Sequence, residues 1–239
     1  MVTFLKIGKY GRLGNQLFQF ASTVGIAEAN GQPWGFPKWD HPFVPDFPGI
    51  DKRKFKQIRI RDAYSGRKWR PYTEVKIKDD EDVSLFGYLQ NERYFKHCEG
   101  LIRHLFTFKD KVKPPKRCEK FIALHIRRGD YGKKTHPTIK KDYYERALNM
   151  MPDLPVIIFT DDKRGARKMF PYCYIAGSTP FRDLNLMTKA TCHVISNSTF
   201  AWWGAWLAES QRVIAPLNWF GDGRDGSYIY PKEWIILSL

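Results

Sequence analysis

The sequence predicts an α/β protein in which a parallel sheet is covered by helices on both faces. Short apolar runs alternate with segments of helical period through the second half of the chain. Glycines or small polar residues follow several of these runs, at positions where a strand would end and a helix begin. The chain has 239 residues, of which 43% are hydrophobic, enough to bury a core in one large or two smaller domains.

The first α/β unit begins at the N-terminus. Residues 3 to 7 are an apolar run that predicts a strand, and glycines interrupt the turn that follows. From Asn15, apolar residues recur at helical spacing as far as an Asn-Gly pair at residues 30 and 31, which is typical of a helix end. We therefore predict a helix over residues 15 to 30, with Asn15 able to cap it. Prolines and aromatics in residues 32 to 80 indicate an ordered but irregular loop.

Two further elements precede the predicted linker. Residues 83 to 89 predict a strand, and residues 94 to 108 predict a helix with a basic face. Residues 109 to 120 combine a Pro-Pro pair with many basic side chains, a composition that favours an inter-domain linker. We place the boundary inside it, which gives an N-terminal α/β domain of residues 1–115 and a C-terminal α/β domain of residues 116–239.

The second half of the chain alternates more regularly. The predicted strands are residues 121–126, 156–159, 172–176, 193–196 and 212–216, the last of the chain. The predicted helices are residues 141–151, a segment ending near residue 170, residues 182–190 and residues 199–210. Ligands of open α/β sheets bind beyond the carboxyl ends of the strands. The polar residues that follow these strands are therefore the candidates for a site.

Composition restricts the partners and the compartment. Lys and Arg number 40 against 25 acidic residues, a formal charge of +15, which favours a phosphorylated or polyanionic partner or an anionic membrane surface. The four cysteines form no CxxC pair, so we expect buried free thiols in a reducing compartment and no zinc site of the usual spacing. No apolar run has membrane-spanning length and no signal peptide is recognisable, so the expected location is the cytoplasm.

The first polar constellation is Gly-Arg-Leu-Gly-Asn-Gln at residues 11 to 16. Gly11 and Gly14 allow a sharp turn and a close approach to a ligand, and the amides and dipole of the following helix favour an anion. The pattern is neither GxGxxG nor a P-loop. A plain turn with Asn15 as helix cap explains it about equally well.

The second constellation is His-Ile-Arg-Arg-Gly-Asp-Tyr at residues 125 to 131. Arg127 or Arg128, directly after a strand, can form two charge-assisted hydrogen bonds to a diphosphate. The alternative is an internal Arg–Asp pair that ties the loop. Both interpretations hold together if one arginine pairs with Asp130 and the other faces the ligand.

Two more strand ends carry polar side chains. In Ser-Asn-Ser-Thr at residues 196 to 199, one hydroxyl can cap the next helix while the others bind phosphate oxygens; ordinary capping is the alternative. The three tryptophans that follow are expected in the core. Asp161 and Asp162 follow another strand and are suited to ribose or a base edge, although charge complementarity with a helix N-terminus also explains them. They do not form DxD, so no metal site is predicted.

Together these segments resemble the ordered motif set of the α-1,2-fucosyltransferases, glycosyltransferase family 11. The matching segments are residues 11–21, 125–131, 159–162 and 196–203, and the closing residues 229–234 are similar to the family's tail. They occur in the family's order, which is more specific than any single motif. Residues 32 to 82 carry no matching motif.

The resemblance implies a GT-B-like fold of two facing Rossmann-like domains with parallel sheets, the N-terminal one on the acceptor side and the C-terminal one on the donor side. It implies inverting, metal-independent transfer of L-fucose from GDP-fucose to a glycan hydroxyl, the 2-OH of a galactosyl residue, with no cofactor. The lack of an apolar run of membrane-spanning length fits a bacterial or viral type without a membrane anchor, and the lysine surplus is compatible with weak association with an anionic membrane.

The alternatives are a fucosyltransferase of another linkage or acceptor, and a non-catalytic basic glycan- or nucleic-acid-binding protein. Nucleic acid is disfavoured as a partner because the basic residues coincide with glycines and capping hydroxyls, a combination that suits a small diphosphate better.

The same resemblance implies residue roles. The catalytic residues would be Arg128, which neutralises the β-phosphate as GDP leaves, Asp130, which supports it, and Asn15, which contacts the diphosphate or fucose. The donor-binding residues would be Gly14, His125, Arg127, Asp161, Asp162, Ser196, Ser198 and Thr199. No general base is evident, and Asp40, His41 and Asp46 are candidates by exclusion.

Overall fold

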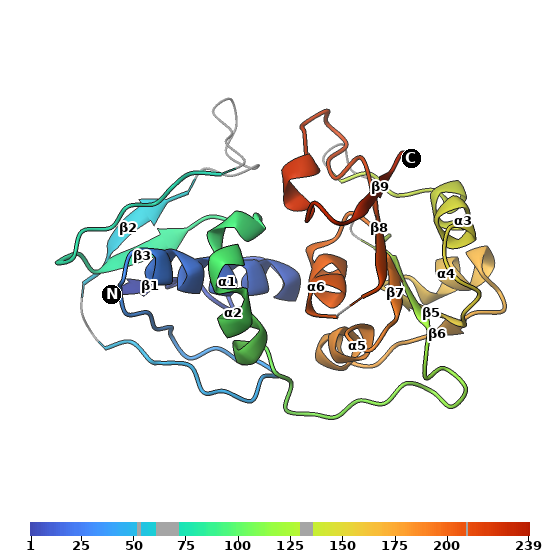
Figure 1. Ribbon diagram of the computed structural model, residues 1–239, viewed down its shortest axis with the longest axis horizontal. Helices are drawn as coiled ribbons and strands as arrows, with labels where there is room; N and C mark the ends of the chain where they lie inside the picture. The colour runs from blue at the N-terminus through green and yellow to red at the C-terminus, as the bar shows by residue number, and fades with distance from the viewer. Residues whose placement is uncertain (52–53, 61–71, 130–135, 209) are drawn as a thin grey trace. The chain divides into compact units, whose positions relative to one another are not determined.

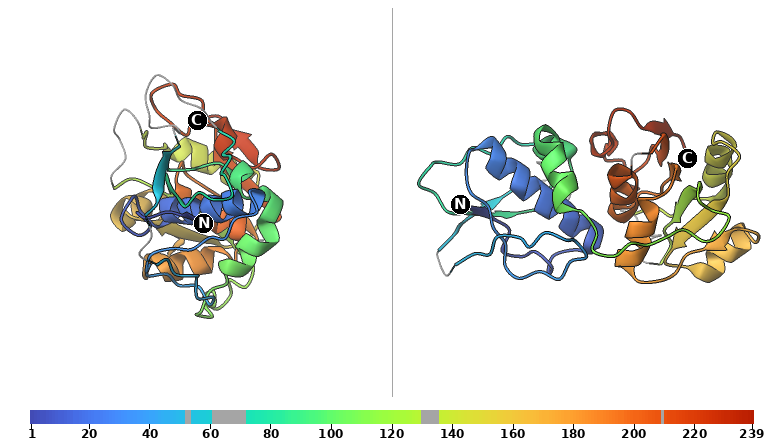
Figure 2. Two further views of the ribbon diagram at one scale, coloured as in Figure 1. Left: turned by 90° about the vertical axis from the view of Figure 1, so that its left-hand side faces the viewer. Right: turned by 60° about the horizontal axis from the view of Figure 1, so that its bottom comes forward.

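The computed structural model describes the chain except for residues 52–53, 61–71, 130–135 and 209. The chain divides into two compact units, Met1–Lys109 and Asp110–Leu239, each built around a parallel sheet (Figure 1, Figure 2). The division falls at the start of the basic, proline-containing segment that we identify as the linker. The boundary placed from sequence lies a short way further along the same segment.

The first unit contains a three-stranded parallel sheet and a long helix. The strands are β1 (Val2–Thr3), β2 (Lys56–Arg59) and β3 (Val83–Phe86), in the order β1-β3-β2. Helix α1 (Leu13–Ala29) packs against β1 and buries most of its length. The strand β2 lies inside the segment that the sequence predicts to be irregular. Its residues are mostly exposed, so its pairing with β3, rather than an apolar pattern, defines it.

The prediction that Asn15 caps the first helix is wrong. Arg12 is the N-cap and Asn15 lies in the first turn. The chain turns into the helix through Gly11, whose φ of 82° is in the left-handed region that favours glycine. The side chain of Asn15 is engaged elsewhere, since its Oδ1 accepts a hydrogen bond from Gln90 Nε2 at 2.9 Å.

The single helix predicted over residues 94 to 108 is also wrong. The segment holds two 3₁₀ turns, η2 (Glu92–Tyr94) and η3 (Lys96–Cys98), and then the short helix α2 (Glu99–Leu105). The backbone around Phe95 lies directly against α1 at Gly25. A Cβ at Gly25 would come within 2.1 Å of the carbonyl oxygen of Tyr94. The close contact falls at Phe95, between the two 3₁₀ turns.

The second unit contains a six-stranded, fully parallel sheet. The strands are β4 (Ile122–Ile126), β5 (Val156–Thr160), β6 (Tyr174–Ile175), β7 (Cys192–Val194), β8 (Arg212–Pro216) and β9 (Ile235–Leu237). Their order is β6-β5-β4-β7-β8-β9. Counted from β4, this is the 3-2-1-4-5-6 order of a doubly wound sheet, with its topological switch point between β4 and β7. The prediction that residues 212 to 216 form the last strand is wrong, because β9 pairs with β8.

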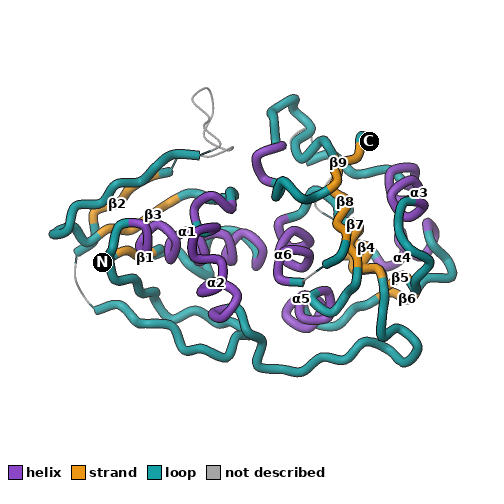
Figure 3. Tube along the Cα trace, viewed as in Figure 1, coloured by secondary structure: helices purple, strands orange, loops and turns teal. Residues whose placement is uncertain are grey.

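Helices cover both faces of this sheet, as the sequence predicts. Helices α3 (Lys141–Asn149) and α4 (Lys163–Met169) lie on one face, and α5 (Pro180–Met187) and α6 (Thr199–Leu207) lie on the other (Figure 3). The core beneath α3 joins β4 to Tyr143 and Tyr144, which are fully buried. The prediction that the tryptophans of α6 belong to the core is confirmed, since Trp202 and Trp203 are 0% exposed.

The described residues include no helix with both the length and the apolarity that a membrane crossing requires. All four cysteines are free; Cys192 is buried, and Cys98, Cys118 and Cys173 are partly exposed.

Candidate functional site

The loops after β4 and β5 meet at the carboxyl edge of the second sheet. The register pairs His125 with Phe159 and Ile126 with Thr160, so the residues that follow these strands are neighbours. Asp161 holds the β4 loop in place. Its carboxylate pairs with Arg127 Nη1 at 3.0 Å and accepts the backbone N–H groups of Arg128 and Gly129 at 2.9 and 3.1 Å.

The two arginines are held differently. Arg127 is 15% exposed and tied to Asp161, whereas the side chain of Arg128 is 40% exposed. Arg128 Nε lies 3.4 Å from Asp162 Oδ2, and its Nη1 contacts the sulfur of Met169 at 3.5 Å. Its Nη2 has no hydrogen-bond partner among the described residues. Arg128 therefore keeps donor capacity for a ligand, and Arg127 forms an ion pair with Asp161 that ties the β4 loop to the β5 loop.

Among the described residues, the carboxylate partners of the two arginines are aspartates of the loop after β5. Asp161 and Asp162, which the sequence suggests for ribose or base contacts, are engaged by Arg127 and Arg128. Asp162 also caps α4, accepting the N–H of Gly165 at 2.9 Å. Asp130, the partner expected from sequence, lies outside the described residues.

His125 and Ser196 connect the two strands of the switch point. His125 Nδ1 lies 2.8 Å from Ser196 Oγ, and the two residues are 4% and 0% exposed. Burial, reinforced by Arg127, lowers the pKa of His125 to about 3, so the imidazole is neutral. As placed, both side chains position the loops and offer almost no surface to a ligand.

The loop after β7 leads into α6 at the switch point. Ser198 is the N-cap of α6, but its hydroxyl makes no capping hydrogen bond and has no partner among the described residues. Helix α6 begins at Thr199, and the backbone amides and partial positive charge at its N-terminus favour an anion. Ser198 is only 5% exposed, so as placed its hydroxyl offers little surface to a ligand, and its role at a phosphate oxygen stays a prediction.

The predicted residues of the first unit form a cluster at its own sheet edge. Asn15, in the first turn of α1, and Gln90, in the loop after β3, are joined by their side-chain hydrogen bond. Gln16 Nε2 donates to the carbonyl of Gly11 at 2.9 Å and fixes the turn. Gly14 is buried within α1. The partner Gln90 is not identifiable from sequence, because it lies 75 residues from Asn15 and belongs to no motif.

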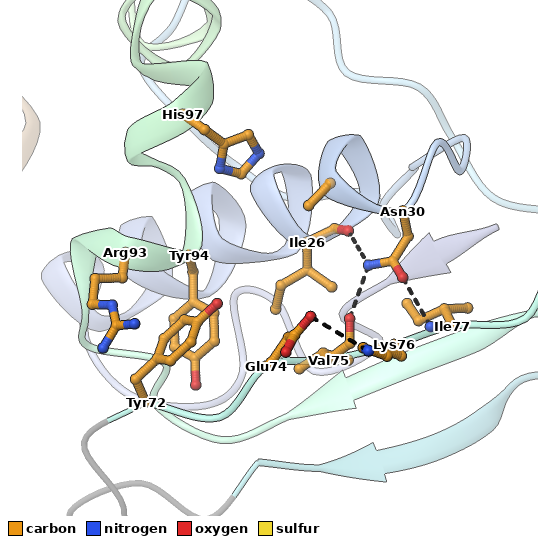
Figure 4. Close-up of a pocket in the computed structure, with 11 residues that line it drawn as sticks. Ile26, Asn30, Tyr72, Glu74, Val75, Lys76, Ile77, Arg93, Tyr94 and His97 are labelled. Atoms are coloured by element: carbon orange, nitrogen blue, oxygen red, sulfur yellow. Dashed lines mark hydrogen bonds and ion pairs between the residues drawn. The ribbon is translucent and has the colours of Figure 1, made fainter.

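A cavity of about 460 Å³ lies at the other end of α1 (Figure 4). Asn30 closes one side of it, donating to the carbonyls of Ile26 and Val75 at 2.8 and 2.9 Å and accepting from the N–H of Ile77. A helix rises about 1.5 Å per residue, so this end lies roughly 20 Å from Asn15. No residue of the predicted site lines this cavity.

Folding stability should fall as the pH is lowered from 7 to 5. Burial lowers the pKa values of His125 and His193 to about 3 and about 4 from an ordinary 6.5. Between the folded-state pKa and 6.5, each of these histidines binds a proton in the unfolded chain but not in the folded chain. Each histidine therefore lowers the free energy of unfolding by up to about 1.4 kcal/mol for every pH unit below 6.5. Urea denaturation across this range measures the slope. An imidazolium NMR signal from either residue at pH 5 would contradict the expectation.

The fold is that of a doubly wound α/β protein, and its second sheet carries a partly exposed arginine and a helix N-terminus at its carboxyl edge. The chain matches the sequence profile of Glycosyl transferase family 11 over residues 3–238, and it belongs to that family. This confirms the family predicted from sequence.

Three curated relatives illustrate the match. An Alpha-1,2-colitosyltransferase of Escherichia coli is 31% identical over 64% of this chain and 62% of its own length. The O-antigen biosynthesis glycosyltransferase WbnK of Escherichia coli is 36% identical over 48% of this chain and 44% of its length. The human Galactoside alpha-(1,2)-fucosyltransferase 1 is 24% identical over 85% of this chain and 65% of its length. The chain thus spans less than two thirds of the length of each.

Two solved structures share the fold. The fucosyltransferase NodZ from Bradyrhizobium has a TM-score of 0.54 at 12% identity, covering 89% of this chain and 94% of its own. NodZ alpha-1,6-fucosyltransferase soaked with GDP-fucose has a TM-score of 0.51 at 13% identity, covering 89% and 93%. Together with the two parallel sheets, they confirm the α/β, GT-B-like fold class.

Proposed function

We propose that the protein is a fucosyltransferase that moves L-fucose from GDP-fucose to a glycan hydroxyl, the 2-OH of a galactosyl residue. The observation that carries this proposal is the half-exposed guanidinium of Arg128 at the carboxyl end of β4, beside the switch point where α6 begins. Family membership and the relatives' names support the reaction class. The second candidate is transfer of a colitosyl group by the same site, favoured by the colitosyltransferase among the relatives.

The site is suited to stabilising a leaving diphosphate. When the bond between the sugar's anomeric carbon and the β-phosphate oxygen breaks, negative charge develops on GDP. A fixed cation, a hydroxyl and helix amides aimed at that oxygen act more strongly on the transition state than on the ground state. Arg128, Ser198 and the N-terminus of α6 are these groups. Attack by the acceptor hydroxyl from the opposite face of the sugar inverts the anomeric centre.

Metal independence is part of the proposal. The positive charge that a cation would supply comes here from Arg128 and α6. In the part of the chain that the structure describes, the carboxylates beside the arginines are held in ion pairs, Asp161 by Arg127 and Asp162 by Arg128. Each ion pair leaves its carboxylate less available to a divalent cation.

Among the candidate bases, His41 is the least suited. Burial and Lys109 lower the pKa of His41, which favours the neutral ring. However, its Nδ1 already accepts the N–H of Phe43 at 3.3 Å, so in the neutral ring Nε2 carries the proton. The exposed carboxylates Asp40 and Asp46 are therefore the remaining candidates for the base.

GDP and GDP-fucose should raise the melting temperature, and EDTA should leave turnover unchanged. A ligand at one hundred times its Kd stabilises by about 2.7 kcal/mol, which corresponds to roughly 5–10 °C for a chain of this size. UDP-galactose is the matched control and should give no shift. A chain that no GDP-sugar stabilises would refute the donor, and activity restored only by Mg²⁺ or Mn²⁺ would refute metal independence.

The acceptor requires its own test. GDP-fucose and GDP-colitose are each supplied with galactose-terminated oligosaccharides, and the product linkage is read by NMR. A correlation between the fucosyl anomeric proton and galactose C2 is expected. Transfer to another hydroxyl, or turnover with GDP-colitose alone, would replace the proposed linkage or donor sugar.

A further inference from the structure

Helix α4 presents a face of basic side chains to solvent. Its inward side carries Ala166, which is buried, and Met169, which packs partly against the core. The helix contains no acidic residue, and its exposed residues occupy positions i, i+1, i+4 and i+5, which lie on one face of a helix. These exposed residues are Lys163, Arg164, Arg167 and Lys168.

Ion pairing within the fold does not account for this basic face. On α3, both basic side chains pair with a carboxylate four residues away, at 2.8 and 2.9 Å. Among the described residues, Arg164, Arg167 and Lys168 have no such carboxylate partner. Arg164 and Lys168 are instead a like-charge pair at i, i+4, as are Lys163 and Arg167, and such pairs destabilise a helix. A counter-charge from a binding partner would remove this cost.

The helix dipole explains only half of these cations. Positive charge is favourable in the last turn, where Arg167 and Lys168 lie, and unfavourable in the first turn, where Lys163 and Arg164 lie. The carboxylate of the N-cap residue Asp162 is already engaged by an ion pair and by a capping hydrogen bond. The first-turn cations therefore also favour an anionic partner outside the helix.

Two exposed tyrosines border the basic face. Tyr172 is 100% exposed, the most exposed of the large apolar side chains that the structure describes, and Tyr174 in the edge strand β6 is 53% exposed. Arg167 Nη1 donates to the carbonyls of Pro171 and Cys173 at 3.0 and 2.9 Å, so the loop that carries Tyr172 is held against the end of α4. Strand β6 lies beside α4 (Figure 1). A tyrosine ring with an apolar body and a polar tip is suited to a boundary between water and an apolar phase.

The linker adds positive charge at the same edge of the sheet. Val112 and Tyr174 border one small cavity, so this part of the linker runs beside β6. Lys111 and Lys113, on either side of Val112, are both exposed. The basic character of α4 therefore continues onto the neighbouring segment of the chain.

We propose that this surface docks on an anionic phospholipid membrane. Clusters of about four to eight Lys or Arg bind anionic headgroups, and tyrosine rings lie at the headgroup level. A planar bilayer fits the convex side of a helix at a sheet edge, whereas single-stranded nucleic acid binds in a groove that follows its backbone. The inference is independent of the proposed donor and acceptor. We call these residues the α4 surface: Lys163, Arg164, Arg167, Lys168, Tyr172 and Tyr174.

Flotation of the full chain with lipid vesicles tests this proposal. The protein should bind vesicles that contain phosphatidylglycerol and should not bind vesicles of phosphatidylcholine alone. Each Lys or Arg near an anionic surface changes the partition coefficient about fivefold, so Arg164→Gln/Lys168→Gln should lower it about 25-fold. Salt at about 1 M should release most of the bound protein. Circular dichroism checks that the variant is folded.

Two further variants assign the effect to the α4 surface. Lys189→Gln/Lys232→Gln removes the same charge from exposed positions, one after α5 on the other sheet face and one beside the opposite edge strand β9, and should bind as the wild type does. Tyr172→Ser removes the exposed ring and should lower the partition coefficient about threefold at any salt concentration, because apolar contact is not screened. Arg164→Gln/Lys168→Gln should keep the wild-type turnover on a soluble oligosaccharide.

The outcomes separate this inference from the proposed function. Failure of the wild-type chain to bind phosphatidylglycerol vesicles would overturn the proposal, as would an equal loss of binding in Lys189→Gln/Lys232→Gln. Tighter binding to poly(U) RNA than to vesicles, weakened by Arg164→Gln/Lys168→Gln, would assign the surface to nucleic acid instead. A fall in soluble turnover in that variant would place these cations in the reaction site and overturn the docking role. A wild-type chain that binds vesicles but transfers no sugar would refute only the proposed function.

Discussion

Replacement of Arg128 by alanine should lower turnover about 10²–10³-fold and leave the fold intact. Removing one charge-stabilising donor from a transition state typically costs this much. The loss should appear mainly in kcat, because the negative charge on the leaving diphosphate is largest in the transition state. Arg128 has only two contacts with other described side chains, at 3.4 and 3.5 Å, so its removal leaves the core unchanged. Steady-state kinetics with GDP-fucose, alongside circular dichroism, measure both effects.

Two variants make the Arg128 result specific. Lys189→Ala removes one positive charge from an exposed position of the same unit and should leave turnover unchanged, so it controls for net charge. Arg128→Lys keeps the charge but loses the planar guanidinium, and it should recover only part of the rate. If Arg128→Ala turned over at a rate near that of Lys189→Ala, the arginine would be a structural ion pair.

Replacement of Trp202 by alanine should destabilise the second unit by about 3–5 kcal/mol. Trp202 is 0% exposed, and its ring centroid lies 4.9 to 5.9 Å from those of Trp203, Trp206 and Trp234. Its indole N–H also donates to the carbonyl of Ile229 at 2.8 Å. The substitution therefore creates a large cavity and leaves that buried carbonyl without its donor. Urea denaturation followed by circular dichroism gives the free energy of unfolding.

Tyr172→Ala is the control for removing an aromatic ring. Tyr172 is 100% exposed, so its loss should change the free energy of unfolding by no more than about 0.5 kcal/mol. Trp202→Phe keeps most of the ring area but not the N–H donor. Its cost in free energy of unfolding should lie between those of Tyr172→Ala and Trp202→Ala. A cost below about 1 kcal/mol for Trp202→Ala would mean that the closing segment around Ile229 does not depend on this contact.

The switch point explains why the candidate residues gather in the second unit. At this position the chain leaves β4 towards one face of the sheet and leaves β7 towards the other, so their loops diverge and open a crevice. Arg128 stands at the end of β4, and Ser198 at the start of α6. The buried hydrogen bond between His125 and Ser196 joins the end of β4 to the loop after β7 and so fixes the spacing of the two loops.

The sequence by itself determined the fold class, the elements of the second unit except β9, and the identity of its polar strand ends. These features are local: an apolar run, a helical period and the residues that end them are contained in a few consecutive positions. Arg127, Arg128, Asp161, Asp162 and Ser198 were identifiable because each lies in the short segment that follows a strand.

The tertiary structure alone decided which of these side chains are partners. Arg127 is tied to Asp161 because the register sets the ends of β4 and β5 side by side, and Asn15 meets Gln90 because β1 and β3 are neighbours. The exposure of Tyr172 beside the basic face of α4 likewise emerged only from the packing of its loop. Such pairings depend on strand order and on contacts between residues far apart in the chain, and no local sequence pattern encodes them.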